Sequence, residues 1–200
     1  MKKVLLALLM STGLFAYDGT TKAIVGVETG YGQFDYSAAN EDNINMGRTS
    51  TSEDFGILGL KIGAESEEFR IFLDAKYYQV GGDFDYANSM GGSFQYLMFI
   101  SRDFNFFFGI NGGLMNLKVV DSTIGKSYEY SDPYFGGDVG FNYEVHEKLG
   151  FEVGIRYLNI NASNTQYYTD ADTGNTMSRT YTVDQMMNIY ASMIFKYYTD

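Results

Sequence analysis

Hydrophobic and polar residues alternate along most of the chain with a period of two, which indicates β-strands rather than helices. In the first such segment, Val25, Val27 and Tyr31 alternate with Gly26 and Glu28. The other segments also have one apolar face and one face rich in charge or glycine. The pattern predicts eight strands, at residues 25–32, 58–65, 69–78, 92–101, 104–113, 135–145, 149–157 and 188–197.

The register of the fourth segment is less regular than the others. We favour a register in which Phe94, Tyr96, Met98 and Ile100 point outward. Leu97 and Phe99 lie between them and leave the opposite register open.

The connections between the predicted strands differ in length in a regular way. Three are short, at residues 66–68, 102–103 and 146–148, and four are long and polar, at residues 37–54, 80–90, 120–133 and 162–184. With an even number of strands, all short connections fall at one end. This layout predicts an all-β fold: an eight-stranded antiparallel up-and-down transmembrane β-barrel with four long extracellular loops and three short periplasmic turns.

A soluble barrel of the lipocalin kind alternates in the same way but points its apolar face inward. Three observations favour the apolar face outward, toward lipid. Glycines crowd the polar face, as a narrow interior requires. Aromatic residues gather near both ends of the apolar face, as in a membrane-embedded barrel. The charges on the polar face also balance, as buried charges must.

These balanced charges are five acidic and five basic residues, predicted to form a network that fills the barrel: Glu28, Asp74, Asp138, Glu144 and Glu152 against Lys61, Arg70, Lys76, Arg156 and Lys196. Two alternatives to a filled barrel interior remain. The carboxylates of Glu144 and Glu152 could serve acid–base catalysis, or the interior could leave a narrow pore with an apolar passage along Phe72, Phe107, Leu158 and Ile160.

Residues 1–16 have the order of a secretory signal peptide, with Lys2 and Lys3 before a short apolar run and a cleavage site after Ala16. Residues 17–200 then form the barrel domain. This organisation predicts export and insertion into a bacterial outer membrane of the Gram-negative cell envelope. The formal net charge of −11 argues against a nucleic-acid partner.

The chain resembles the small outer-membrane barrels related to the OmpA transmembrane domain and OmpX, over residues 17–200. The alternation of Ile189, Ala191, Met193, Phe195 and Tyr197 is similar to the terminal strand that the barrel-insertion machinery of that family recognises. Phe195 and Tyr197 would then belong to the insertion signal. The chain departs from the family pattern because Tyr198, Thr199 and Asp200 follow. The resemblance also implies contact with outer-membrane lipid and lipopolysaccharide.

The sequence offers little for catalysis, metal binding or a cofactor, and we predict none of the three. The chain has no Cys and a single histidine, His146, in a predicted periplasmic turn. The run from Asp170 through Asp172 to Gly174 is similar to part of a calcium loop, but the glycine comes one residue early. We interpret this run as an ordinary polar loop.

The predicted extracellular loops combine acidic residues with tyrosines, a composition that binding surfaces favour. The candidate interaction surface contains Asp83, Asp85, Tyr128, Tyr130, Tyr167, Tyr168, Asp170 and Asp172. The sequence therefore favours a non-enzymatic surface protein that serves envelope integrity or adhesion to an extracellular ligand or host surface. The alternative is a narrow porin-like channel for small solutes.

Overall fold

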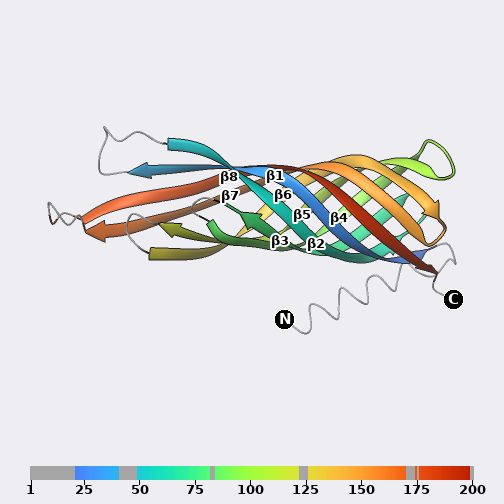
Figure 1. Cartoon of the computed structure of the whole chain (residues 1–200), viewed down its shortest axis with the longest axis horizontal. Coiled ribbons are helices and arrows are strands. Elements are labelled where there is room, and N and C mark those ends of the chain that lie inside the picture. Colours follow the sequence, from blue (N-terminus) through green and yellow to red (C-terminus); the bar gives the residue numbers. More distant parts are fainter. Residues whose placement is uncertain are drawn as a thin grey trace.

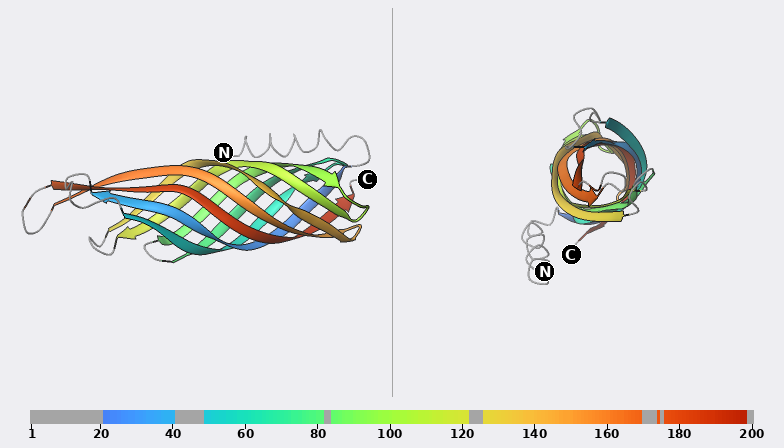
Figure 2. Two further views of the ribbon diagram at one scale, coloured as in Figure 1. Left: turned by 90° about the horizontal axis from the view of Figure 1, so that it is seen from above. Right: turned by 90° about the vertical axis from the view of Figure 1, so that its left-hand side faces the viewer.

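Eight antiparallel strands close into one barrel, in which each strand pairs with its sequence neighbours and β8 pairs with β1 (Figures 1 and 2). The computed structural model describes residues 21–40, 49–81, 84–121, 126–169, 174 and 176–198. The predicted fold class is confirmed. The strands are β1 (Lys22–Asn40), β2 (Thr49–Glu65), β3 (Phe69–Val80), β4 (Phe84–Phe99), β5 (Phe104–Asp121), β6 (Lys126–His146), β7 (Leu149–Thr169) and β8 (Thr176–Tyr198).

The three short connections lie at one end of the barrel, at the same end as the first residue of β1 and the last residue of β8. The predicted signal peptide, residues 1–16, lies outside the described residues. Within the described part of the chain, no helix is long and apolar enough to span a membrane.

The prediction of four long loops is wrong over most of their length, because strands occupy most of those residues. β7 and β8 pair as far as Thr169 opposite Thr176, and β1 pairs with β2 as far as Ala38 opposite Thr49. Serine, threonine and asparagine in these segments suggest loops. Antiparallel pairing nevertheless satisfies their backbone groups, and side chains such as Thr165 and Thr180 hydrogen-bond across the hairpin, 2.7 Å apart.

The charged and glycine-rich face points into the barrel, and the apolar face points outward. Glu28 and Arg70 are 1% and 0% exposed, whereas Tyr31 and Leu58 are 59% and 62% exposed. This arrangement excludes the soluble alternative for the part of the barrel nearer the short turns. The favoured register of β4 is confirmed, since Phe94 and Met98 are exposed and Leu97 is buried. Phe99 departs from the alternation and is exposed at the end of the strand.

The two faces exchange character farther along the strands. On β1 the outward side chains up to Tyr31 are apolar except for Thr29, whose hydroxyl bonds the Ile57 carbonyl. From Gln33 the outward side chains are polar, and the inward Phe34 is fully buried. On β2 the outward Asp54 is exposed beside the buried, inward Phe55. An apolar outer face suits lipid and a polar outer face suits water, so this change marks one boundary of the membrane-spanning part. Beyond it the strands form an extension whose core is apolar, as in a water-soluble protein.

This extension divides into two sheets rather than continuing as a ring. Pairing of β6 with β7 runs only to Phe135 opposite Asn159, and pairing of β2 with β3 ends at Phe55 opposite Val80. Over the described residues beyond those points, β7, β8, β1 and β2 stay paired in one sheet, and β4, β5 and β6 in another. The long hairpins at the left of Figure 1 belong to these two sheets.

Candidate functional site

The centre of the interior is an ion-pair network around Arg156. Its guanidinium donates two hydrogen bonds to the carboxylate of Glu28, Nη1 to Oε1 at 2.6 Å and Nη2 to Oε2 at 3.0 Å. Arg156 also lies 3.7 Å from Asp138, and its Cζ is 4.1 Å from the centre of the Tyr190 ring. Because β8 lies between β1 and β7 in the barrel wall, the pair joins two strands that are not hydrogen-bonded to each other.

A chain of ion pairs runs from this centre toward the short turns. Lys61 lies 3.5 Å from Glu28 and donates to Glu152 at 2.8 Å. Arg70 donates from Nη1 to the other oxygen of Glu152 at 2.7 Å. Its Nε lies 2.9 Å from Oε2 of Glu65. These five side chains are at most 5% exposed, so each charge needs an oppositely charged partner inside the barrel.

Lys196 is the last member of this series of ion pairs, at the turn end of the barrel. Its Nζ lies 2.6 Å from Glu65 and 2.5 Å from Glu144. Glu65 therefore links Arg70 to Lys196, although it was absent from the ten predicted network residues. Strand alternation could have found it, because Glu65 shares its face of β2 with Lys61.

Of the remaining predicted network residues, Asp74 and Lys76 lie beside this series of ion pairs, and Asp138 joins it through Arg156. Lys76 contacts Asp74 on the same strand. Asp138 accepts hydrogen bonds from Gln95 at 3.1 Å and from the Tyr190 hydroxyl at 2.9 Å. The structure thus brings nine of the named side chains into one linked set: Asp138, Arg156, Glu28, Lys61, Glu152, Arg70, Glu65, Lys196 and Glu144.

An apolar cluster fills the interior at the level of the extension. Phe34 is its centre, with its ring 4.5 Å from that of Phe55 and 5.9 Å from that of Phe84. Every strand contributes to the cluster, which also contains Ile57, Tyr78, Ala87, Met115, Leu117, Tyr134, Leu158, Ile160, Ala162, Val183 and Met186. The alternation pattern did not predict this cluster, because most of its residues lie at or just beyond the ends of the predicted strands. Only Phe84, Ala87, Ala162 and Val183 fall within the predicted loops.

The apolar passage considered from the sequence is not assembled as one unit. Leu158 and Ile160 belong to the large cluster, whereas Phe72 packs with Ile24 and Ile194. Phe107 packs in a third group with Leu97 and Tyr190. The four residues are therefore distributed over three separate clusters.

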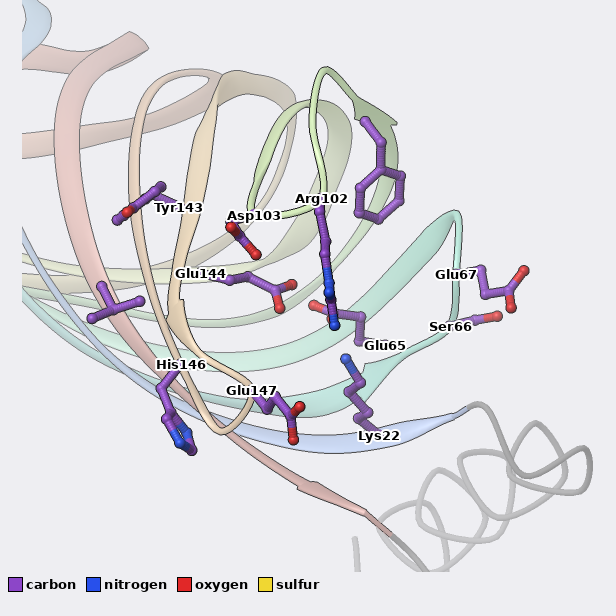
Figure 3. A pocket seen from close by; sticks show the side chains of 12 residues that line it. Lys22, Glu65, Ser66, Glu67, Arg102, Asp103, Tyr143, Glu144, His146 and Glu147 are labelled. Carbon is purple, nitrogen blue, oxygen red and sulfur yellow. The ribbon is translucent and has the colours of Figure 1, made fainter.

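A cavity of about 950 Å³ opens at the end with the short turns. Figure 3 shows Arg102 reaching from the β4–β5 turn into this cavity, between Glu65 and Glu144. His146 at the end of β6 and Glu147 in the β6–β7 turn also line the cavity. His146 is exposed and accepts a hydrogen bond at Nδ1 from the backbone N–H of Lys148, at 3.3 Å. Among the described residues, no group of three or more His, Asp or Glu is arranged to hold a metal ion.

The predicted loop surface falls mainly on strands. Asp85 lies on β4 and pairs with Lys118 at 2.6 Å, and this carboxylate raises the pKa of the Lys118 ammonium. Tyr167 is 69% exposed on β7. The backbones of Tyr128 and Tyr130 lie on β6 and that of Tyr168 on β7, whereas Asp83, Asp170 and Asp172 lie outside the described residues.

Further acidic side chains surround the extension. Asp35 accepts hydrogen bonds from Gln185 and Ser52, at 2.6 and 2.7 Å, and these bonds hold the pKa of its carboxyl below the ordinary value. Glu129 accepts a bond from the Tyr86 hydroxyl at 2.5 Å, and this bond raises the pKa of Tyr86. The outer face of the extension is thus both hydrogen-bonded and acidic.

The terminal strand places its predicted insertion residues on the outer wall. Phe195 and Tyr197 on β8 are 38% and 55% exposed, next to the start of β1. Lys196 between them points inward.

Comparisons with known proteins agree with this architecture. The outer membrane protein beta-barrel domain family matches residues 4–183. No curated protein matches the chain. Among solved structures, OprG from Pseudomonas aeruginosa is 15% identical, with a TM-score of 0.68 over 90% of this chain and 99% of that one.

Two further structures share the fold. Neisserial surface protein A is 15% identical, with a TM-score of 0.59 over 88% of this chain and 97% of that one. The N-terminal barrel domain of Pseudomonas aeruginosa OprF is 10% identical, with a TM-score of 0.50 over 86% and 97% of the two chains. At these identities the likeness concerns the fold alone. The family match covers most of the sequence, and the chain therefore belongs to the outer membrane protein beta-barrel domain family and is a protein of the bacterial outer membrane.

Proposed function

We propose that this chain is a closed, non-enzymatic barrel that acts at the cell surface through its extension, in envelope integrity or adhesion. The filled interior carries this proposal. The ion-pair network occupies the bore from the turn end to its middle, and the apolar cluster occupies it at the level of the extension. An eight-stranded barrel is just wide enough for side chains to fill, so two filled levels in series leave no route for ions.

The two levels differ in their relation to water. Asn142 and Asn188 are buried inside the barrel, and their amide groups have no hydrogen-bond partner among the described residues. Buried amides of this kind usually bond ordered water, so the network level is expected to be hydrated. The Phe34 cluster offers few polar groups to water. We therefore assign the barrier to ions chiefly to the apolar cluster.

Planar bilayers test the closed barrel. The reconstituted wild-type protein is expected to leave the conductance at its background level, because ions would have to cross the dry apolar cluster. Glu28→Gln with Arg156→Gln should also stay closed, since the apolar cluster is untouched. A stable, reproducible conductance of the wild-type protein would contradict the proposal and favour the narrow channel. A pore-forming barrel in the same bilayers serves as the positive control.

The acidic outer face supports a cationic or hydrogen-bonding partner for the extension. Asp54, Asp85 and Glu129 are exposed, and on that face the one cation among the described side chains, Lys118, is already paired. Like charges would repel an anionic partner. The exposed Tyr167 on β7 adds an aromatic group of the kind that recognition surfaces favour.

Binding to charged polymers checks this assignment. Protein in nanodiscs is expected to bind immobilised poly-lysine more tightly than dextran sulfate, and added salt should weaken the binding. Asp54→Asn with Glu129→Gln should weaken it about fivefold, if each exposed charge contributes about 0.5 kcal/mol. Glu67→Gln, in a turn at the opposite end, is the matched control. Equal binding to both polymers would argue against an electrostatic surface.

For insertion into the membrane, we propose that Phe195 and Tyr197 present the terminal strand to the barrel-insertion machinery. Their outward position at the end of β8 supports this role. Contact of the outer wall with membrane lipid and lipopolysaccharide is proposed on the same basis, since the exposed apolar band needs a hydrocarbon environment.

A further inference from the structure

A groove of about 550 Å³ lies on the outer wall, across strands β1 to β4. Ala75 on β3 forms its floor, and Leu58, Leu60, Tyr77 and Met90 form its sides. We call these residues the wall groove. It lies outside the ion-pair network and the turn-side cavity, and the general lipid contact proposed for the outer wall does not single it out.

Strand pairing explains the concave shape. Leu60 pairs with Ala75, and Ala75 pairs with Met90, so the three side chains lie side by side and point outward. A methyl group therefore lies between two long side chains. Gly59 next to Leu60 points inward and leaves only backbone on the outer face. Leu60 and Met90 are 62% and 65% exposed, so no other part of the described chain covers the groove.

The position of the groove determines what surrounds it. Leu58, Tyr77 and Met90 lie near the end of the outward apolar band, and Gln79 and Asn88 follow as the next outward residues on β3 and β4. The short turns lie at the other end, which places the groove at the extracellular side of the membrane-spanning part. At this depth the available solvent is hydrocarbon, and an apolar concavity is filled by acyl chains.

A polar group lies at the rim of the groove. Asn88 also lines it, and its Oδ1 accepts a hydrogen bond from Nδ2 of Asn116 at 2.9 Å. This bond orients the Asn88 amide and leaves its NH₂ group as a donor. An acyl chain in the groove would have its carbonyl, an acceptor, near this rim.

We propose that the wall groove is a binding site for one acyl chain of an outer-leaflet lipid, with the chain against Ala75 and its ester or amide carbonyl near Asn88. The proposal rests on the outer-membrane location and does not depend on a closed interior. A conducting barrel could hold the same lipid, so the two proposals can fail separately.

Native mass spectrometry of the detergent-solubilised protein with dipalmitoyl phosphatidylethanolamine tests the site. Wild type is expected to retain one lipid preferentially, and Ala75→Phe, which fills the floor, should reduce that occupancy about tenfold, the effect of about two methylene contacts. Ala191→Phe adds the same bulk to an exposed alanine on β8 and should retain the lipid. Equal occupancy in Ala75→Phe and wild type would overturn the proposal.

The absence of tryptophan from the chain permits a test of location. Tyr77→Trp places a fluorophore on the groove, and Phe135→Trp places one on the outward face of β6. A brominated lipid at low mole fraction in micelles should quench the first more than the second, and Ala75→Phe should remove the difference. Equal quenching of both reporters would contradict a preferred site. Heat-modifiable gel mobility verifies that each variant is folded. If Ala75→Phe does not fold, Ala75→Leu is used in its place.

Discussion

Arg156→Met is expected to lower the free energy of unfolding by about 3–5 kcal/mol, the usual cost of removing one partner from a buried ion pair. Arg156 makes both of its close contacts with Glu28, and the next cation, Lys61, is 3.5 Å from that carboxylate and already bonded to Glu152. Without the guanidinium, the linked set keeps five carboxylates but only three cations, and the charge of Glu28 loses its closest partner beside Asp138. The variant should unfold at a much lower urea concentration than wild type.

Urea titration of protein in lipid vesicles, followed by heat-modifiable gel mobility, measures this change. Lys118→Met removes a cation from a solvent-exposed pair and is expected to cost less than about 1 kcal/mol. Adding Glu28→Gln to Arg156→Met should restore part of the loss, because it removes the unpaired charge. If the Arg156→Met and Lys118→Met variants unfold at the same urea concentration, the network does not stabilise the barrel.

Gly140→Val is expected to prevent most of the protein from reaching the folded barrel. A Cβ atom at Gly140 would collide with the carbonyl oxygen of Val153, and would lie 2.6 Å from Cζ of Phe107 and 2.7 Å from Cα of Gly154. The neighbouring strand backbone cannot move aside without breaking the β6–β7 pairing. The cost should therefore exceed the roughly 1–3 kcal/mol typical of overpacking a core.

Gly56→Val is the matched control, since a Cβ atom there meets nothing within 4 Å. Valine favours strands, so neither substitution is opposed by local propensity. After refolding into vesicles, the folded fraction on an unheated gel should be near wild type for Gly56→Val and much lower for Gly140→Val. Similar folded fractions for the two variants would show that the narrow interior does not require glycine at this position.

The wall of the barrel follows from the sequence because lipid and a narrow bore restrict the two faces of each strand differently. Alternation around Leu58 and Lys61 assigns both residues to the correct side. The number of strands and the position of the short turns follow from the same pattern. Local periodicity is sufficient to predict the membrane-spanning part of each strand, because one face of that part meets lipid and the other meets the bore.

The extension cannot be predicted by assigning the apolar face outward, because there the outer face is polar and the inner face is apolar. Phe34 and Phe55 continue the alternation but point inward, so a search for an apolar outer face ends before them. Partner choice across the bore is also beyond local pattern. Glu65 is on the expected face, yet its contacts with Arg70 and Lys196 depend on strand tilt and on residues far apart in the chain.

The division of the extension into two sheets has a consequence for how the surface can vary. The outer part of the β7–β8 hairpin pairs with β1 but not with β6, and Gly174 at its tip has a positive φ of 70°. Pairs of residues can therefore be gained or lost at the tip without shifting the register of any strand in the wall. Insertions and deletions in the exposed hairpins would therefore leave the membrane-spanning wall unchanged.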